Sequence, residues 1–159
     1  MKITDSIPRA TVSINLRFLE ENYRAIKSLL PEDVKILCVV KADAYGHGAI
    51  QVTKRLEFVG AGYFGVASLN EALGLRKEGI NSPLLVMSGI LPWDSTISFI
   101  HHRLTPVVYD MDILKRLAKE SIDFDSPLNV HIKFDTGMGR LGFSQDEIPE
   151  VISTLKRTK

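Results

Sequence analysis

The sequence predicts an α/β protein made of parallel βα units, and two features of the chain support this prediction. Short apolar segments rich in β-branched residues alternate with amphipathic segments along the whole chain. The connections between them are short, as in βα units whose helices cover a parallel sheet. About five such units fit either a small doubly wound sheet or most of an eight-unit barrel, which needs about 250 residues.

The first helix is predicted between two clear boundary signals. Asn15 can cap its start, and Pro31 marks its end. Between them, apolar residues recur every three or four positions and so share one helical face. These residues are Leu16, Leu19, Tyr23, Ile26 and Leu30.

Five apolar segments are the predicted strands of the sheet. They are Val34–Lys41, Tyr63–Ala67, Pro83–Met87, Leu104–Val108 and Leu128–Phe134. Strands this short and continuously apolar are typical of a sheet that is buried on both faces. The one cysteine of the chain, Cys38, lies in the first of them, so we expect a buried thiol and no disulfide within the chain.

Helix signals fill the intervals between these strands. Two Ser-x-x-Glu capping boxes, Ser68–Glu71 and Ser144–Glu147, each open a helix, and Gly79 closes the first of the two. The other predicted helices are Ala49–Glu57, Ser95–His102 with Asp94 as its cap, and Met111–Glu120 with Asp110 as its cap.

Charge and composition exclude some partners. The 159 residues include 20 basic and 19 acidic side chains, and the formal net charge of +1 gives no reason to expect nucleic acid or an anionic membrane. Met1–Ala10 lacks the apolar core of a signal peptide, and we expect a cytoplasmic protein. His101 and His102 have no further ligand at metal-binding spacing, so no metal site is expected. Trp93 is expected to pack beneath a loop.

The chain stops inside its last predicted helix. Lys156–Lys159 follows an amphipathic segment and contains neither a cap nor a glycine. We therefore expect this sequence to be a fragment of a longer protein.

The first segment that could carry chemistry follows the first predicted strand. Lys41 comes at the carboxyl end of that strand, the end at which parallel α/β folds assemble their sites. Such a lysine often extends to water, but a partly desolvated amine is free to attack a carbonyl group. Tyr45, His47 and two glycines follow, and glycines let a backbone approach a ligand closely. The segment suggests a Schiff-base lysine beside a phosphate pocket.

The second such segment follows the fifth predicted strand. Three charged residues, Lys133, Asp135 and Arg140, lie at its carboxyl end. Three glycines between residues 137 and 142 also spell G-x-G-x-x-G, a pattern of dinucleotide sites. That pattern normally opens a βαβ unit and is answered by an acidic residue about 20 positions on. No further strand follows here, so the dinucleotide interpretation fails.

Taken together, the two segments resemble the alanine racemases. Residues 39–48 (VVKADAYGHG) resemble the pyridoxal phosphate (PLP) attachment signature of that family, and residues 131–142 (HIKFDTGMGRLG) resemble its second block. The opening helix, with Arg9, Leu16, Leu19 and Asn22, resembles the start of the family. The resemblance covers essentially the whole chain. It implies a TIM-type (β/α)8 barrel in the intact family and here a partial barrel of about five βα units, with residues 1–12 as a leading segment and 13–159 as the barrel portion.

The resemblance also implies a role for several residues. Lys41 would hold PLP as a Schiff base and act as one of two acid/base groups at the substrate α-carbon. Tyr45 would hydrogen-bond the cofactor phosphate. Arg140 would contact the phenolic oxygen of PLP and lie near the substrate carboxylate. Lys133 would be the lysine that is carbamylated in many members and positions that arginine.

Other residues of the two segments are assigned smaller roles. His47 and Asp135 are expected either to be structural or to support the residues that contact the ligand, and Asp43 stands where family members have asparagine or aspartate. The resemblance implies an isomerase that interconverts L- and D-alanine, supplies D-alanine for peptidoglycan and works as a homodimer. The family's remaining barrel units and its C-terminal β domain, which provides the tyrosine on the opposite face of the substrate, are missing from this sequence. We therefore expect weak cofactor binding and little activity from these residues alone.

Two other interpretations stay open at this stage. One is another fold-type III PLP protein: an amino-acid decarboxylase, a racemase of another substrate, or a non-catalytic PLP-binding protein. The Gly-Met-Gly-Arg-Leu-Gly run favours alanine racemase over the other two enzymes, and the Tyr-Gly-His-Gly continuation at Tyr45–Gly48 favours it over the non-catalytic protein. The other is a folding fragment that binds nothing alone and covers its open sheet edge with another segment or a second copy.

Overall fold

Five parallel strands form one sheet in the computed structural model, which describes residues 10–120 and 127–157. The strands are β1 (Cys38–Val39), β2 (Phe64–Val66), β3 (Leu84–Val86), β4 (Leu104–Val108) and β5 (His131–Ile132). Their order in the sheet is their order in the chain, and every pair is parallel. A doubly wound sheet would reverse its strand order at a switch point. The unbroken order therefore favours a partial barrel, as predicted.

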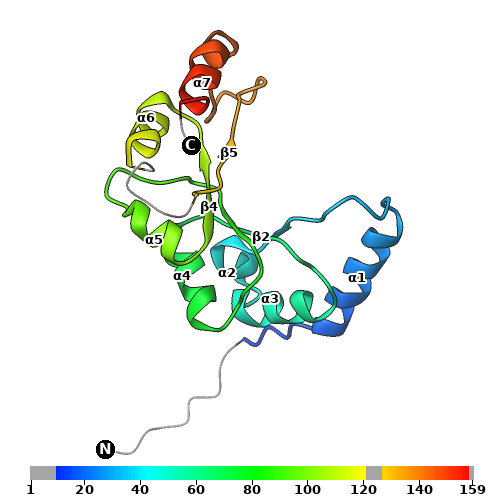
Figure 1. Cartoon of the computed structure of the whole chain (residues 1–159). Coiled ribbons are helices and arrows are strands. Elements are labelled where there is room, and N and C mark those ends of the chain that lie inside the picture. The colour runs from blue at the N-terminus through cyan, green and yellow to red at the C-terminus, as the bar shows by residue number, and fades with distance from the viewer. Residues whose placement is uncertain (1–9, 121–126, 158–159) are drawn as a thin grey trace, which may run out of the picture.

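One helix precedes the first strand and packs against α3, and the other helices follow the strands and lie along the outer side of the sheet (Figure 1). The described helices are α1 (Leu16–Ser28), α2 (Lys41–Gly46), α3 (Ala49–Phe58), α4 (Leu69–Lys77), α5 (Thr96–His101), α6 (Met111–Glu120), the 3-10 turn η2 (Gln145–Glu147) and α7 (Ile148–Leu155). None of the helices in the described part of the chain has the length and apolar character needed to cross a membrane.

Several predicted helix boundaries are confirmed. The Asn15 side chain accepts the backbone N–H groups of Arg17 and Phe18 at the start of α1. The Asp110 side chain accepts the N–H of Ile113 in the first turn of α6. Gly79 follows the end of α4 with a left-handed φ of +85°, which glycine adopts at low cost.

Other predictions about local structure are wrong. Asp94 does not cap α5: its carboxylate accepts the N–H of Leu91 in the preceding turn, and Ser95 is the cap residue. Trp93 is 79% exposed and does not pack beneath a loop. The first strand is two residues long rather than eight: it begins at Cys38 instead of Val34, and at its other end the chain leaves the sheet at Val40.

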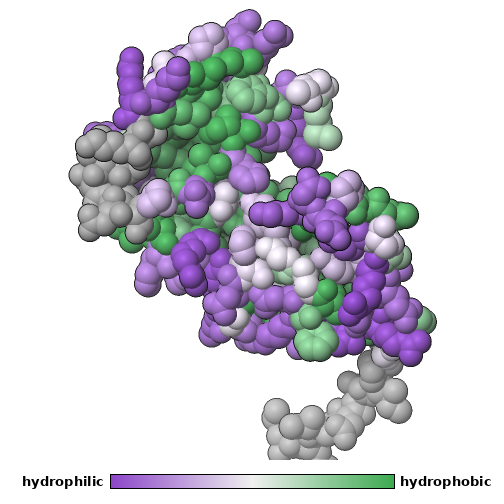
Figure 2. Space-filling model, turned by 45° about the vertical axis from the view of Figure 1, so that its right-hand side comes forward, coloured by the Kyte–Doolittle hydropathy of each residue, from purple (hydrophilic) through white to green (hydrophobic). Residues whose placement is uncertain are grey.

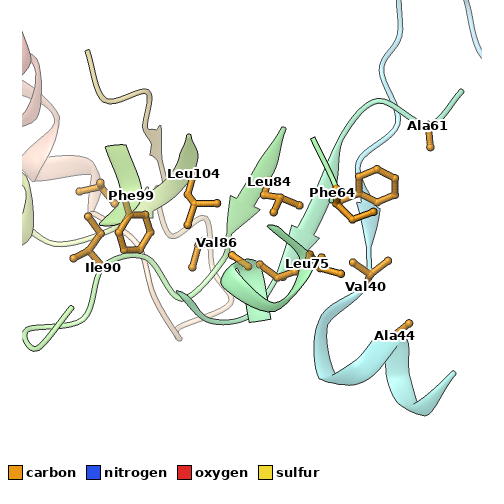
Figure 3. Close-up of a cluster of buried hydrophobic side chains, with 14 of the residues drawn as sticks. Val40, Ala44, Ala61, Phe64, Leu75, Leu84, Val86, Ile90, Phe99 and Leu104 are labelled. Carbon is orange, nitrogen blue, oxygen red and sulfur yellow. The ribbon is translucent and has the colours of Figure 1, made fainter. Parts of the chain in front are cut away.

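The hydrophobic core lies between the sheet and the helices (Figure 3). Phe64, Leu84 and Val86 from the central strands are completely buried there. Leu75 of α4 packs against them, and Phe99 of α5 extends the same cluster. Figure 3 also labels Val40, directly after β1, and Ala44, within the turn that follows, as members of this core.

The opposite face of the sheet is the face that would line a barrel. A side chain added at Gly65 would meet Leu37, Val39 and Met87 on this face. Across it, the Tyr63 hydroxyl lies 3.0 Å from Nε2 of His131. Tyr63 precedes β2 and His131 begins β5, three strands away and further along the sheet, so on a flat sheet their backbones would lie more than about 14 Å apart. The contact requires a sheet that curves toward this face, as a barrel does.

Burial differs between the middle and the ends of the sheet. All residues of β2 and β3 are buried, whereas those of β1 are half-buried and those of β5 are exposed or half-buried. Figure 2 shows apolar surface gathered mainly in one part of the molecule rather than spread evenly. The outermost strands therefore remain less covered than the centre.

Candidate active site

The candidate residues lie where the strands end. Because all strands are parallel, their carboxyl ends meet at one edge of the sheet, here called the carboxyl edge. Lys41 follows β1 at this edge, and Lys133 follows β5 directly. The two predicted segments therefore belong to the same edge, at the two ends of the strand order. Parallel α/β proteins assemble their sites at this edge.

Four consecutive non-glycine residues after Lys41 adopt left-handed backbone angles. Residues 42–45, here called the lysine turn, have φ values between 50° and 55°. Left-handed conformation costs an L-residue roughly 1–2 kcal/mol, and it usually occurs as single residues. The sequence gives little sign of this turn, since only Asp43 among the four belongs to a residue type that tolerates the conformation well. Strain of this kind persists only where the surroundings enforce it.

Hydrogen bonds on both sides enforce the lysine turn. Ala44, 6% exposed, donates its N–H to the Val40 carbonyl at 2.9 Å. The Asp43 carboxylate accepts the N–H of Ala49 at 2.7 Å, and the Asp43 carbonyl accepts the N–H of Gly48. The turn is thus tied to the end of β1 and to the start of α3.

His47 closes the lysine turn with its ring. Its Nδ1 lies 2.8 Å from the carbonyl oxygen of Ala44 and 3.2 Å from that of Tyr45. Both partners are acceptors, so Nδ1 carries the proton and donates. These contacts agree with the structural role expected for His47.

Three side chains of the predicted set are free to bind a ligand. Within residues 10–120 and 127–157, no hydrogen bond or ion pair engages the Lys41 amine, the Tyr45 hydroxyl or the Arg140 guanidinium. Lys41 is half-buried, while Tyr45 is 61% exposed. An amine, a hydroxyl and a guanidinium without protein partners are suited to an aldehyde and anionic oxygens.

The second segment forms a closed loop, residues 134–143, here called the arginine loop. Phe134 and Phe143 form a β-bridge at its base, where Asp135 donates its N–H to the Phe143 carbonyl. Gly142 has to be glycine: an added Cβ would lie 2.4 Å from the backbone nitrogen of Asp135. The loop presents Arg140 at the surface on a fixed base.

Asp135 organises the arginine loop from inside. Its Oδ1 accepts the N–H groups of Gly137 at 3.0 Å and Gly139 at 3.1 Å. These backbone donors hold the pKa of the Asp135 carboxyl below its ordinary value, and the nearby Lys133 amine contributes in the same direction. In the part of the chain that the structure describes, no hydrogen bond joins the Lys133 side chain to Arg140.

One residue at this edge escaped sequence analysis. The carboxylate of Glu71, in the first turn of α4, accepts the N–H of Ala42 within the lysine turn at 2.9 Å. It also accepts the N–H of Ala67 after β2 at 2.7 Å. The capping-box pattern Ser68–Glu71 predicted the start of α4, and it gave no sign that Glu71 would contact the chain next to Lys41.

Fold and site together define a class: a parallel α/β protein of barrel type with a free lysine at the carboxyl end of its first strand. The family model described as "Alanine racemase, N-terminal domain" matches residues 14–159. The chain belongs to this family.

Alanine racemases of several bacteria resemble the chain in sequence. It is 43% identical over 152 residues to alanine racemase 1 of Caldanaerobacter subterraneus subsp. tengcongensis, a match that covers 92% of this chain and 39% of that protein. It is 41% identical over 148 residues to the alanine racemase of Coxiella burnetii, covering 93% of this chain and 39% of the relative. The chain thus spans about two-fifths of the length of these relatives.

Solved structures show the same relationship. The alanine racemase from E. faecalis has a TM-score of 0.84 and 32% identity, with 92% of this chain and 40% of that chain covered. The alanine racemase from Acinetobacter baumannii has a TM-score of 0.81 and 34% identity, with 90% and 42% covered. The predicted family and the predicted barrel fold are both confirmed.

Proposed function

We propose that this chain provides the lysine side of a PLP-dependent racemase that interconverts L- and D-alanine. One observation carries the proposal: in a member of this family, Lys41 is half-buried at the carboxyl edge, directly before an enforced turn, and its amine has no hydrogen-bond or ion-pair partner among the residues that the structure describes. A lysine that served only the protein surface would need neither the enforced turn nor the position.

The residues present fit PLP. Lys41 would hold its aldehyde carbon covalently, and the Tyr45 hydroxyl would donate to its phosphate. Arg140 would donate to its phenolic oxygen, and Lys133, near that loop, would support the arginine, as a carbamate if it is carbamylated. When bound, the cofactor withdraws electrons from the substrate α-carbon and so makes its proton acidic.

The acid/base work falls to side chains on both faces of the substrate. Lys41 would remove or return the α-proton on one face. The Arg140 guanidinium would hold the substrate carboxylate by charge-assisted hydrogen bonds and so fix which face meets the lysine. A second proton donor has to act on the opposite face, and we assign it to residues outside these 159.

The proposal also covers the division of the chain into segments and the assembly, location and role of the full-length protein. The leading segment would be residues 1–12 and the PLP-binding barrel portion residues 13–159. In a protein of the relatives' full length, the activity would require a homodimer in the cytoplasm and would supply D-alanine for peptidoglycan.

The first experiment uses the chain itself. Incubation with PLP should give the visible absorbance of a lysine Schiff base, weakly, and little conversion of L-alanine to D-alanine by chiral chromatography. Robust turnover by these 159 residues alone would contradict the assignment of the second proton donor to other residues.

A chimera tests the function directly. Residues 1–159 replace the matching part of the Caldanaerobacter racemase, the relative with 43% identity. The chimera should racemise alanine when PLP is added, and Lys41→Ala should lower the rate by at least about 10²–10⁴-fold, the usual contribution of a positioned acid/base group. A folded chimera that leaves alanine unchanged, or that is indifferent to Lys41→Ala, would contradict the proposal.

A further inference from the structure

We propose that Glu71 is a positioning residue for Lys41: its carboxylate fixes the lysine turn against the end of β2. The proposal rests on the function proposed for Lys41 and adds a residue to it. Glu71 does not touch the reacting atoms; it acts through the backbone that carries the lysine.

The hydrogen bonds of the Glu71 carboxylate differ from those that a capping box predicts. In a capping box, the glutamate accepts the N–H of the cap residue. The serine's hydrogen bond of the capping box is present, since the Ser68 hydroxyl accepts the N–H of Glu71 at 3.4 Å. The carboxylate, however, turns to two amides outside the box, with Oε1 on Ala42 and Oε2 on Ala67. It therefore bridges the chain directly after Lys41 and the chain directly after β2.

The sheet explains why these two amides need a partner. Val40 donates its N–H to the Gly65 carbonyl, as the parallel ladder between β1 and β2 requires. In the next step of this ladder, the Ala67 N–H would donate to the Val40 carbonyl. That carbonyl is already taken by Ala44, because the chain has turned into the lysine turn. Glu71 replaces the lost ladder bond and holds the first amide of the turn at the same time.

This bridge acts on the orientation of Lys41. The amide of Ala42 is the peptide bond that joins it to Lys41, so a fixed Ala42 N–H fixes one side of the lysine backbone. The other side is fixed by Val40, which is 2% exposed in the core. With both sides held, the direction in which the Cα–Cβ bond of Lys41 leaves the backbone is set before any ligand binds, and fewer positions remain open to the amine.

A carboxylate is needed for this bridge, and a glutamine side chain would not replace it. The N–H groups of Ala42 and Ala67 donate to different oxygens of the carboxylate, and both of these positions must therefore be acceptors. Glutamine has the same size but offers one oxygen and an NH2 group that also donates. Glu71→Gln therefore removes one of the two hydrogen bonds and leaves the volume of the side chain unchanged.

The test measures which lysine reacts with PLP. The chain is incubated with limiting PLP, reduced with borohydride, digested, and the pyridoxyl label on each lysine is quantified by mass spectrometry. Lys41 should carry most of the label in the unaltered chain. Glu71→Gln should lower the label on Lys41, relative to the surface lysines, by about tenfold, the size of effect expected for the loss of a hydrogen bond to a charged group.

Glu147→Gln is the matched control. It alters the glutamate of the other Ser-x-x-Glu box, whose carboxylate contacts Ser144 of its own box. This variant should label Lys41 as the unaltered chain does. A merely structural role for Glu71 would lower the unfolding midpoint of Glu71→Gln and leave the share of label on Lys41 unchanged in the folded protein. That result would overturn the proposal.

The two proposals fail in different ways. If the unaltered chain carries no more pyridoxyl label on Lys41 than on its other lysines, the proposed function is contradicted, and so is the positioning role that rests on it. If PLP labels Lys41 preferentially, and to the same extent, in the unaltered chain and in Glu71→Gln, only the positioning role is wrong. Should Glu71→Gln fail to fold, amide exchange in the unaltered chain decides: slow exchange at Ala42 and Ala67 supports the bridge, and exchange at the rate of a free peptide at either amide overturns it.

Discussion

Two segments of this chain share the pattern Ser-x-x-Glu and use it differently. At Ser144–Glu147, the glutamate accepts both the N–H and the hydroxyl of Ser144, at 2.7 and 2.9 Å, and the box is closed on itself. At Ser68–Glu71, the glutamate leaves the box and bridges two strand ends. The same pattern thus only caps a helix in one place, and in the other its glutamate also supports the candidate active site.

The difference comes from what surrounds each box. Ser144 is exposed and lies beyond the last described strand, so its glutamate has no strand end to bridge. Glu71 is half-buried beside β1 and β2, where the early exit of β1 from the sheet leaves an amide without its ladder partner. A capping motif therefore predicts where a helix begins, and the neighbouring backbone decides how its carboxylate is used.

The largest expected effect is a difference in the free energy of unfolding between variants of the two glutamates. Glu71→Ala should lower the free energy of unfolding by about 2–3 kcal/mol, because two amides lose a charged acceptor. Glu147→Ala should lower it less, because within the described residues its carboxylate accepts hydrogen bonds only from Ser144, which is exposed, so water can replace it as the acceptor. Urea denaturation followed by circular dichroism measures both values. Equal losses for the two variants would show that the bridge to the strand ends adds nothing to stability.

The sequence predicts the fold well, because periodicity and caps are local signals. Helices α1 and α6 begin at the predicted residues, and β4 has the predicted bounds. The strand order could not be derived from these signals alone. The family resemblance implied a barrel, and the contact between Tyr63 and His131 shows the curvature of the sheet.

The candidate site is predicted only in part. Lys41 could be found because it ends an apolar strand within a recognisable motif. The four left-handed residues after it could not, since alanine and tyrosine do not favour that conformation and nothing local requires it. Glu71 could not be found either, because its bonds to Ala42 and Ala67 exist only once β1 and β2 are paired.

A smaller effect is expected at Asp43, which ties the lysine turn to α3. Asp43→Ala removes the acceptor for the N–H of Ala49 and should cost about 1 kcal/mol, as the loss of a helix cap does. Asp43→Asn keeps both an acceptor oxygen and the tolerance for left-handed angles, so it should be close to the unaltered chain. Urea denaturation of the two variants side by side measures this difference. A loss as large for asparagine as for alanine would show that the charge of Asp43, rather than its hydrogen bond, stabilises the turn.

The smallest expected effect is a pH dependence confined to the closed box. Hydrogen bonds from the backbone and hydroxyl of Ser144 hold the pKa of Glu147 below its ordinary value of 4.5. A carboxyl group whose pKa is lowered by folding stabilises the folded state above its unfolded pKa, and this contribution disappears as the pH falls through the folded pKa. The difference in unfolding free energy between the unaltered chain and Glu147→Gln should therefore be constant near neutral pH and shrink below about pH 4.5. Denaturation curves from pH 7 down to pH 3 measure it, with Asp33→Asn as the control for general charge effects, because Asp33 is exposed and its side chain forms no ion pair within the residues that the structure describes. A difference that grows as the pH falls would mean that the neutral form of Glu147 is the one that the fold favours.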